Sequence, residues 1–386
     1  MTYRTQPQPQ PPQTRPPSGQ APPKRSRRAW AAGASALVIA GVAAGCALSD
    51  ADVFSDTGDV IRFDQDQDQN REQGQDQGRA TAQPGTPAHA PADPLTRMPM
   101  GPRPELRIAA TIPEDGSKVM VTTLAGKKSG FTGKVWLWVP PQYKEPRYAR
   151  SGFPVLIALP GGPGYPDNYW MDKNLKLESS VSKWSKEGSS LPFILAMPVL
   201  NPQTDAGGLY WDGSDIPGQP KMGTWLTEDV PDLVRATFRT IGSRDGWGFL
   251  GNSTGAFAGL KAVLQKPDEF KAVIANGPDI VPDSRLWNGH PQEKAENSPP
   301  QLAQQILDHD GPEVYLGFQV GTTGTDVRTR PPIERFIAEY GTGPVKTRLS
   351  VNQGGGHSAY SYVPGMYGGG LIQWISRHMR GPVPSP

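Results

Sequence analysis

Residues 251–255, Gly-Asn-Ser-Thr-Gly, carry the pattern G-x-S-x-G, with Ser253 between two glycines. Where this pattern joins a strand to a helix, it forms a sharp turn that exposes the serine hydroxyl. A serine hydroxyl attacks an acyl carbon only when a neighbouring base accepts its proton. The pattern therefore indicates Ser253 as a nucleophile for acyl chemistry, provided that an acid and a base follow it in the chain.

The histidine that activates Ser253 should come after it, with the acid between them in the chain. Among the five histidines, His357 follows a run of glycines after the last expected strand, so we predict that it is the base. We predict Asp326 as the acid, because it is the only carboxylate in the segment 321–329, an expected loop after a strand. Three other carboxylates remain alternatives for the acid: Asp279, Asp283 and Glu334.

Negative charge that develops on the attacked carbonyl needs two backbone N–H donors, an oxyanion hole. Thr254, directly after the serine, is predicted to supply one of them. The segment 159–165, Leu-Pro-Gly-Gly-Pro-Gly-Tyr, is predicted to supply the other. Since its prolines have no N–H, we assign this role to Gly162, with Gly161 as the alternative.

Aromatic residues in two loops are candidates for contacts with a substrate. Residues 201–223 form a long Gly- and Pro-rich segment without periodic pattern, and such loops often line sites. We predict that Tyr210 and Trp211 in this segment bind substrate, as does Trp170, which follows Tyr169 in an earlier loop. The alternative is that these aromatic side chains pack the loops onto their own domain.

The elements that would position these residues alternate between strands and helices. Short apolar runs typical of buried strands cover residues 153–162, 191–199, 247–252, 270–277, 313–321 and 346–356. Amphipathic helical patterns cover residues 228–238, 254–266, 332–341 and 368–379. Two alternating segments, 118–127 and 133–143, indicate additional edge strands. This order predicts an α/β fold with a mostly parallel central sheet and helices on both faces.

The N-terminal 48 residues resemble an export signal. Four basic residues between 24 and 28 precede the uncharged segment 29–48, as in a positive n-region followed by an apolar h-region. Residues 42–46, Val-Ala-Ala-Gly-Cys, resemble a bacterial lipobox, in which Cys46 would be lipidated. A plain signal peptide and an uncleaved membrane anchor are the alternatives. Each of these places the protein outside the cell membrane, extracellular or tethered at the cell surface.

Composition separates the rest of the chain into two parts. Residues 49–104 are rich in Gln, Asp and Pro, which predicts a disordered tether. Residues 105–386 are long enough for one large domain. A net charge of +2 gives no reason to expect nucleic acid, and the single cysteine excludes a disulfide within the domain. We expect a monomer that needs no metal or organic cofactor.

Several segments, in their order along the chain, resemble the putative esterase family of α/β-hydrolases. These are VWLWVPPQY and FPVLIALPGG, then the long segment 251–277 that begins GNSTGAF, and then GGHSAYSY around His357. The family includes enterobactin esterases, S-formylglutathione hydrolases, feruloyl esterases and secreted mycolyltransferases. The resemblance implies an α/β-hydrolase fold and ester chemistry through Ser253, His357 and Asp326. Pro160, Pro163 and Ala359 depart from the family's pattern, and the latter two make trehalose transfer doubtful.

We therefore expect an exported serine hydrolase that cleaves carboxylic esters of a small molecule or of the cell envelope. Two alternatives remain open. An acyltransferase would use the same acyl-serine intermediate but pass the acyl group to a sugar or another alcohol. A binding lipoprotein would keep the scaffold without catalysis, and at least one of its three catalytic residues would be misplaced.

Overall fold

The computed structural model describes residues 60–61, 95–203 and 209–385. Within these residues, ten strands form one sheet in the order β1-β3-β4-β5-β7-β6-β9-β10-β11-β12. Their bounds are β1 (Val60–Ile61), β3 (Leu106–Thr111), β4 (Lys118–Ala125), β5 (Thr132–Trp138), β6 (Val155–Leu159), β7 (Ile194–Pro198), β9 (Trp247–Asn252), β10 (Ala272–Asn276), β11 (Val314–Gly321) and β12 (Val345–Asn352). A second, two-stranded sheet pairs β2 (Thr96–Arg97) with β8 (Thr240–Ile241).

Six neighbouring strands of the large sheet, from β7 to β12, run parallel. The strands β1, β3, β4 and β5 continue the sheet with antiparallel pairs, and β5 pairs antiparallel with β7. Every residue of β6, β7, β9, β10 and β11 is buried, because these strands are covered on both faces.

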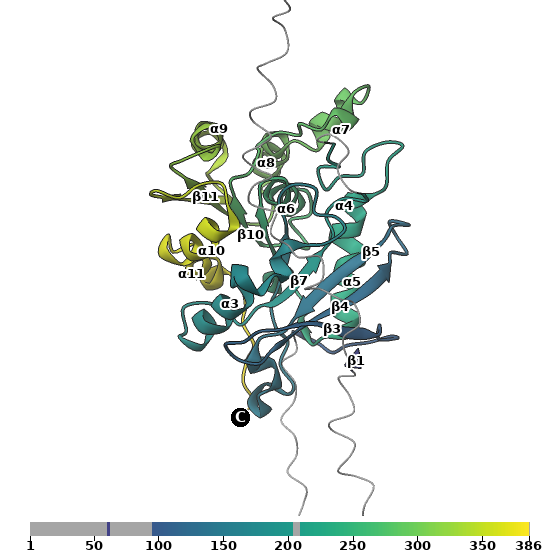
Figure 1. Cartoon of the computed structure of the whole chain (residues 1–386). Helices are drawn as coiled ribbons and strands as arrows, with labels where there is room; N and C mark the ends of the chain where they lie inside the picture. Colours follow the sequence, from purple (N-terminus) through teal and green to yellow (C-terminus); the bar gives the residue numbers. More distant parts are fainter. Residues whose placement is uncertain (1–59, 62–94, 204–208, 386) are drawn as a thin grey trace, which may run out of the picture. The chain divides into compact units, whose positions relative to one another are not determined.

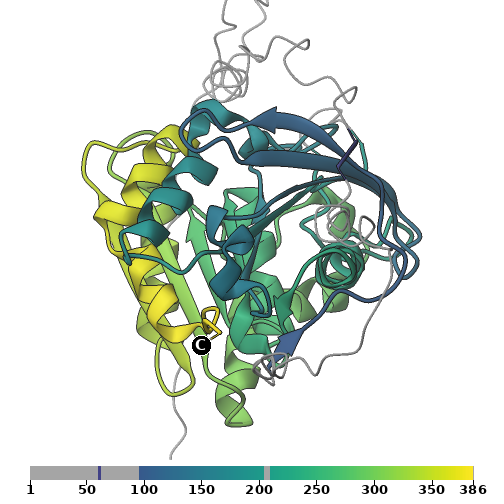
Figure 2. The same ribbon diagram turned by 90° about the horizontal axis from the view of Figure 1, so that it is seen from below.

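The helices lie on both faces of this sheet (Figures 1 and 2). Their bounds are α3 (Leu177–Lys186), α4 (Met222–Thr224), α5 (Val230–Thr237), α6 (Thr254–Gln265), α7 (Pro291–Glu296), α8 (Pro299–Asp308), α9 (Asp326–Tyr340), α10 (Ala359–Gly368) and α11 (Leu371–His378). On one face α6 packs against β6, β9 and β10, and α8 packs between α6 and α9. On the other face α11 covers β10 and β11, and α3 meets α10 through the stacked rings of Trp184 and Tyr367. The predicted fold class is confirmed.

The elements β3, α3, α7, α8 and α10 were not expected from sequence, and two expected helices begin elsewhere than predicted. The helix expected at 332–341 begins six residues earlier, at Asp326, so its two prolines fall inside α9. The turn of chain before α5 is a π-helix, Trp225–Asp229, continuous with α5. Both differences concern helix starts, where prolines near a first turn make the boundary hard to read from sequence.

The expected export signal, Cys46 and most of the expected tether lie outside the described residues. Two short strands, however, fall inside the range 49–104. β1 pairs with β3 at the edge of the large sheet, and β2 pairs with β8. A pair of residues is too short to give a periodic pattern, so sequence alone offered no signal for either strand. In the described part of the chain, no helix is both long enough and apolar enough to cross a bilayer.

Candidate active site

The three predicted catalytic residues, and Gly277 beside them, lie where neighbouring parallel strands end. Ser253 follows β9, Gly277 follows β10, and His357 lies five residues beyond the end of β12. Asp326 begins α9, five residues after β11. Because adjacent parallel strands end at the same edge, these four segments meet there.

Ser253 has backbone angles φ 50° and ψ −120°, a conformation that is costly for any residue except glycine. The turn closes tightly on both sides of it. A Cβ atom on Gly251 would lie 2.3 Å from the carbonyl oxygen of Gly255, and one on Gly255 would lie 2.3 Å from that of Pro160. Only glycines therefore allow α6 to approach β6 and β9 this closely, and the turn has the geometry of a nucleophile elbow.

Asp326 and His357 form the central contact of the site. The Nδ1 atom of His357 lies 2.6 Å from Oδ1 of Asp326. The Asp326 side chain is completely buried, whereas 22% of the His357 side chain is exposed. A buried carboxylate on Nδ1 leaves Nε2 of the ring as the nitrogen that can exchange a proton with a nucleophile. The structure thus brings together the acid and the base that the sequence predicted.

A tyrosine that the sequence reading did not assign completes this contact. The Tyr362 hydroxyl donates to the Asp326 carboxylate, with its oxygen 2.8 Å from each carboxylate oxygen. It also lies 2.9 Å from Nδ1 of His357. The amide of Gly321 is a third donor to Asp326. Tyr362 lies on α10, so this helix also positions the acid and the base.

These hydrogen bonds decide the charge of Asp326. Burial alone would raise the pKa of this carboxyl group. The hydrogen bonds from His357, Gly321 and Tyr362 outweigh it and hold the pKa below its usual value. Burial and the neighbouring Asp326 charge raise the pKa of Tyr362. Asp326 is therefore a carboxylate at neutral pH, and Tyr362 is a neutral donor to it.

Gly277 connects the serine to the histidine. The Ser253 amide donates to the carbonyl oxygen of Asn276 at 2.9 Å, and Gly277 is the next residue. Gly277 has φ 56°, and a Cβ atom there would lie 2.7 Å from Nδ1 of His357 and 2.4 Å from the Tyr362 oxygen. One short segment after β10 therefore contacts both the elbow and the imidazole.

The predicted oxyanion loop lies against the elbow. The hydroxyl of Thr254 donates to the carbonyl oxygen of Gly162 at 3.1 Å. Thr254 begins α6, where the amide N–H groups point out of the helix and have no partner within it. The side chain of Thr254 thus fastens the loop that carries Gly162 to the helix N-terminus. That Gly162 and Thr254 donate to an oxyanion stays a prediction.

Gly161, the alternative donor, is already engaged. Its amide donates to the hydroxyl oxygen of Tyr169 at 2.7 Å.

Two of the three aromatic residues predicted to bind substrate are part of the core, and this correction has a clear cause. Trp170 is completely buried, and its indole N–H donates to the carbonyl oxygen of Leu159. Trp211 is 3% exposed, and its indole N–H donates to Gln219. Tyr210 is half-buried. An aromatic residue in an irregular loop looks the same in sequence whether it packs inward or lines a site.

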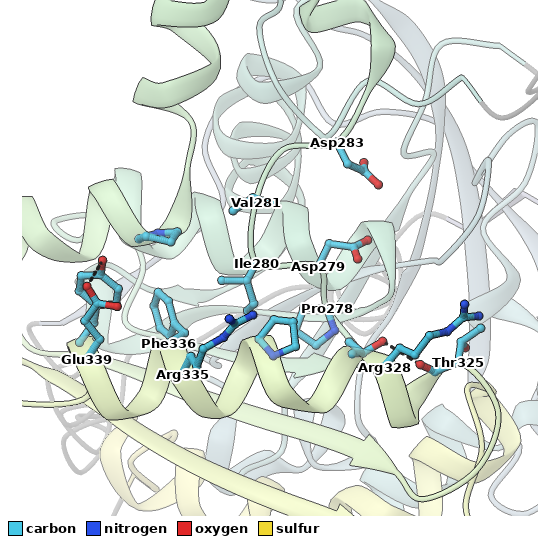
Figure 3. A pocket seen from close by; sticks show the side chains of 14 residues that line it. Pro278, Asp279, Ile280, Val281, Asp283, Thr325, Arg328, Arg335, Phe336 and Glu339 are labelled. Carbon is cyan, nitrogen blue, oxygen red and sulfur yellow. Dashed lines mark hydrogen bonds between the residues drawn. The ribbon is translucent and has the colours of Figure 1, made fainter. Parts of the chain in front are cut away.

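A cavity of about 630 Å³ lies between α9 and the segment after β10 (Figure 3). Two of its lining residues, Pro278 and Thr325, directly follow Gly277 and directly precede Asp326. Asp279 and Asp283, two of the alternative acids, also line it. Partial burial raises the pKa of Asp279 to about 6, whereas the nearby His357 lowers this pKa. The side of this cavity formed by Asp279 therefore lies close to the imidazole.

The third alternative acid, Glu334, forms a surface ion pair with Arg330 on α9. Among the three alternatives and Asp326, the hydrogen bond to His357 belongs to Asp326. In the described part of the chain, no three His, Cys, Asp or Glu side chains are grouped so that they could hold a metal ion.

Comparison with known proteins identifies the family. Residues 132–370 match the sequence profile of a family described as putative esterases. The chain belongs to this esterase family. The esterase is 26% identical over 150 residues to an uncharacterized protein of Corynebacterium glutamicum. These residues are 38% of the esterase but only 33% of the relative, so the match spans about a third of that protein's length.

Solved structures show the same fold at low sequence identity. A ferulic acid esterase matches with a TM-score of 0.55 and 18% identity, over 68% of this esterase and 99% of that chain. An S-formylglutathione hydrolase from Agrobacterium tumefaciens matches with a TM-score of 0.52 and 18% identity, over 69% and 96%. The fluorophosphonate-binding serine hydrolase F of Staphylococcus aureus matches with a TM-score of 0.54 and 13% identity, over 67% and 98%.

Proposed function

We propose that the esterase cleaves carboxylic esters through an acyl-enzyme on Ser253. In this mechanism His357 accepts the proton of the Ser253 hydroxyl as its oxygen attacks the ester carbonyl. His357 then delivers the proton to the departing alcohol. A water molecule, activated by the same histidine, attacks the acyl-serine and releases the acid.

Asp326 orients the imidazole and stabilises its positive charge in this proposal. The amides of Thr254 and Gly162 hold the carbonyl oxygen while it carries negative charge. The observation that carries the proposal is the buried 2.6 Å contact between Asp326 and His357, at the edge where the elbow holds Ser253. A binding lipoprotein without catalytic activity would not require this contact between an acid and a base.

We infer that the cavity beside His357 receives one end of the ester. Pro278 and Thr325, which line it, are the chain neighbours of Gly277 and Asp326. The cavity is lined by charged side chains, among them Arg328 and Arg335, and by apolar ones such as Ile280 (Figure 3). A substrate part with both apolar and polar surface fits this lining.

The test is covalent labelling of the purified protein by a fluorophosphonate, since the Staphylococcus aureus neighbour is described as fluorophosphonate-binding. We expect labelling of the wild type and of Ser179→Ala, a control on the surface of α3, but not of Ser253→Ala. Hydrolysis of p-nitrophenyl acetate should follow the same pattern. A folded wild-type protein that is neither labelled nor active would overturn the proposal.

The same assay separates hydrolysis from acyl transfer. Both reactions pass through the acyl-enzyme, so the acceptor of the acyl group must be measured directly. We expect that added glucose or glycerol leaves the yield of free acid from p-nitrophenyl butyrate unchanged. If an acylated alcohol forms in place of the acid, the enzyme is an acyltransferase.

We also propose that the esterase is exported and held at the cell surface. The support is the basic and apolar N-terminal segment with Cys46 at its end. Cell fractionation of the tagged full chain should find it with the membrane and open to added protease. Cys46→Ala should release it from the membrane if a lipid on this cysteine is the anchor, and should leave it bound if the apolar segment itself is the anchor.

A further inference from the structure

An amide side chain is buried near the end of β11, where the other residues of the strand are Val, Tyr, Leu, Phe and Gly. Gln319 is completely buried, and its Oε1 atom has no hydrogen-bond partner among the described residues. A buried acceptor without a partner lowers the stability of the fold, and an apolar side chain of similar size would avoid this cost. The reason for a glutamine at this position must therefore lie in what its side chain contacts.

Gln319 and Asn352, on the neighbouring strands β11 and β12, donate to two consecutive residues of α10. The Nε2 atom of Gln319 donates to the carbonyl oxygen of Tyr362 at 3.3 Å. The Nδ2 atom of Asn352 donates to the carbonyl oxygen of Ser361 at 3.0 Å and lies 2.9 Å from the Ser361 hydroxyl. Amides from two strands thereby hold the first turn of α10 against the sheet.

Gly365 allows α10 to lie this close to both amides. A Cβ atom on Gly365 would overlap Nε2 of Gln319 and would lie 3.0 Å from Nδ2 of Asn352. A residue with a side chain at this position would push the helix and the amides apart. The sequence of α10 is therefore fitted to the two polar side chains beneath it.

The helix turn that these amides hold is the one that contacts the acid and the base. The Tyr362 hydroxyl lies 2.8 Å from the Asp326 carboxylate and 2.9 Å from Nδ1 of His357. The backbone carbonyl oxygen of Gln319 also accepts from the amide of Gly277 at 2.7 Å. Gln319 therefore connects two segments that lie against the imidazole, the turn of α10 and the segment after β10.

We propose that Gln319 and Asn352 are positioning residues, which hold α10 so that the Tyr362 hydroxyl stays on Asp326 and His357 during the reaction. The inference rests on the proposed function, because it requires this acid and base to serve the nucleophile. Small shifts of catalytic groups cause large losses in rate. A buried amide that lowers stability is thus kept for the geometry that it gives to the site.

The test compares Gln319→Met with Gln373→Met in the full-length protein. Met keeps the unbranched shape of Gln without its amide. Gln373 of α11 also donates to a carbonyl oxygen of α10, that of Tyr367, at 3.1 Å, but in the last turn of the helix. We expect Gln319→Met to lower kcat with p-nitrophenyl acetate by at least about 10-fold, with KM little changed. Gln373→Met should keep wild-type values, and equal kcat values for the two variants would overturn the inference.

A double-mutant cycle shows whether the amide acts through the phenol. Tyr362→Phe lacks the hydroxyl, so adding Gln319→Met to it should cause little further loss of kcat. The same fold-loss in both backgrounds would mean that Gln319 acts by another route, and would overturn the inference. If Gln319→Met does not fold, Asn352→Ala takes its place in this cycle with the same two outcomes.

Unfolding by urea separates positioning from support of the fold. The Tyr362 carbonyl oxygen keeps its partner within the helix in Gln319→Met, and the unpaired acceptor is removed. We therefore expect a urea midpoint no lower than that of the wild type, and a midpoint that falls together with kcat would overturn the inference. Fluorophosphonate labelling of Ser253 tests the proposed function separately. A labelled wild type with a fully active Gln319→Met means that only this inference fails.

Discussion

Asp326 is a fully buried carboxylate that accepts hydrogen bonds from the imidazole of His357, the hydroxyl of Tyr362 and the amide of Gly321. Gly321 lies five residues before Asp326, and His357 and Tyr362 lie five residues apart in the segment after β12. The charge of Asp326 is maintained by these donors, because burial alone would favour the protonated form. At the scale of single residues, the site therefore depends on the charge and geometry of this one side chain.

Replacing the acid by its amide tests this dependence. Asp326→Asn keeps the size of the side chain but presents an amide to Nδ1 and favours the wrong tautomer of His357. We expect kcat to fall about 10³–10⁴-fold, as in other serine triads. Steady-state hydrolysis of p-nitrophenyl acetate measures it. Glu334→Gln, at the exposed alternative acid on α9, should stay within twofold of wild type. Equal losses in both variants would contradict the assignment of Asp326.

A substitution at Gly277 tests whether the position of the His357 imidazole is critical for catalysis. Gly277→Ala adds a Cβ atom that would lie 2.7 Å from Nδ1 of His357, so the imidazole must shift. We expect a loss of more than about 10²-fold in kcat, since small misplacements of catalytic groups have effects of this size. Gly289→Ala is the matched control, with φ 88° but nothing within 4 Å of the added atom. Both variants carry backbone strain, so activity should be lost only in Gly277→Ala.

At the scale of elements, α6 holds the elbow at its first turn and the long loop 209–221 at its third. Lys261 of α6 is 1% exposed, and its ammonium donates to the carbonyl oxygen of Gly213 at 2.7 Å and to the Ser214 hydroxyl. Burial lowers the pKa of Lys261 to about 8. The loop is held a second time by Asp212, which accepts from the indole of Trp287 at 2.7 Å. The loop is thereby attached both to α6 and to the segment after β10.

Removing the ammonium should loosen the loop and leave the helix in place. Lys261→Met keeps an unbranched apolar stem inside the helix packing but loses the donors to Gly213 and Ser214. We expect faster amide hydrogen exchange in residues 211–216, because local opening no longer breaks these bonds. Exchange in β9 should not change. Equal exchange of the loop in variant and wild type would show that Lys261 does not hold it.

At the scale of the whole molecule, the buried carboxyl group of Glu178 makes the stability of the fold depend on pH. Glu178 on α3 is completely buried, and neither carboxylate oxygen has a hydrogen-bond partner among the described residues. Burial raises its pKa to about 8, and the charges of Asp172, Asp115 and Glu114 act in the same direction. The folded protein therefore keeps Glu178 protonated at a pH at which the unfolded chain has lost the proton.

The resulting pH dependence can be measured. The unfolded chain ionises Glu178 near its ordinary pKa of 4.5, and the folded protein does so only at about 8. Stability from this group is therefore lost as the pH rises between these values, by on the order of a few kcal/mol. Urea unfolding at pH 5 and pH 8.5 should show this decline in the wild type and in Glu187→Gln, an exposed control. Glu178→Gln should show a much smaller decline; a decline as large as in wild type would contradict this account.

Local sequence patterns were sufficient to predict much of the fold. The apolar runs at 247–252 and 270–277 became β9 and β10 as expected, because a strand buried on both faces needs a continuous apolar sequence. The elbow was also readable, since its glycines and serine are consecutive and their spacing meets a local steric demand. The chain order of Ser253, Asp326 and His357 was readable because each follows a strand of the same parallel sheet.

The tertiary structure alone decided which side chains face the site. Trp170 and Tyr169 are neighbours in sequence, yet Trp170 is completely buried in the core, whereas the half-buried Tyr169 accepts a hydrogen bond from the amide of Gly161. Tyr362 and Asp326 are 36 residues apart in sequence, and no periodic pattern predicts a contact between them. The sequence by itself determined the order of elements and the chemistry available, since both follow from local sterics and apolar period. Long-range packing decided the partners of each polar group, because these depend on segments that meet only in the folded protein.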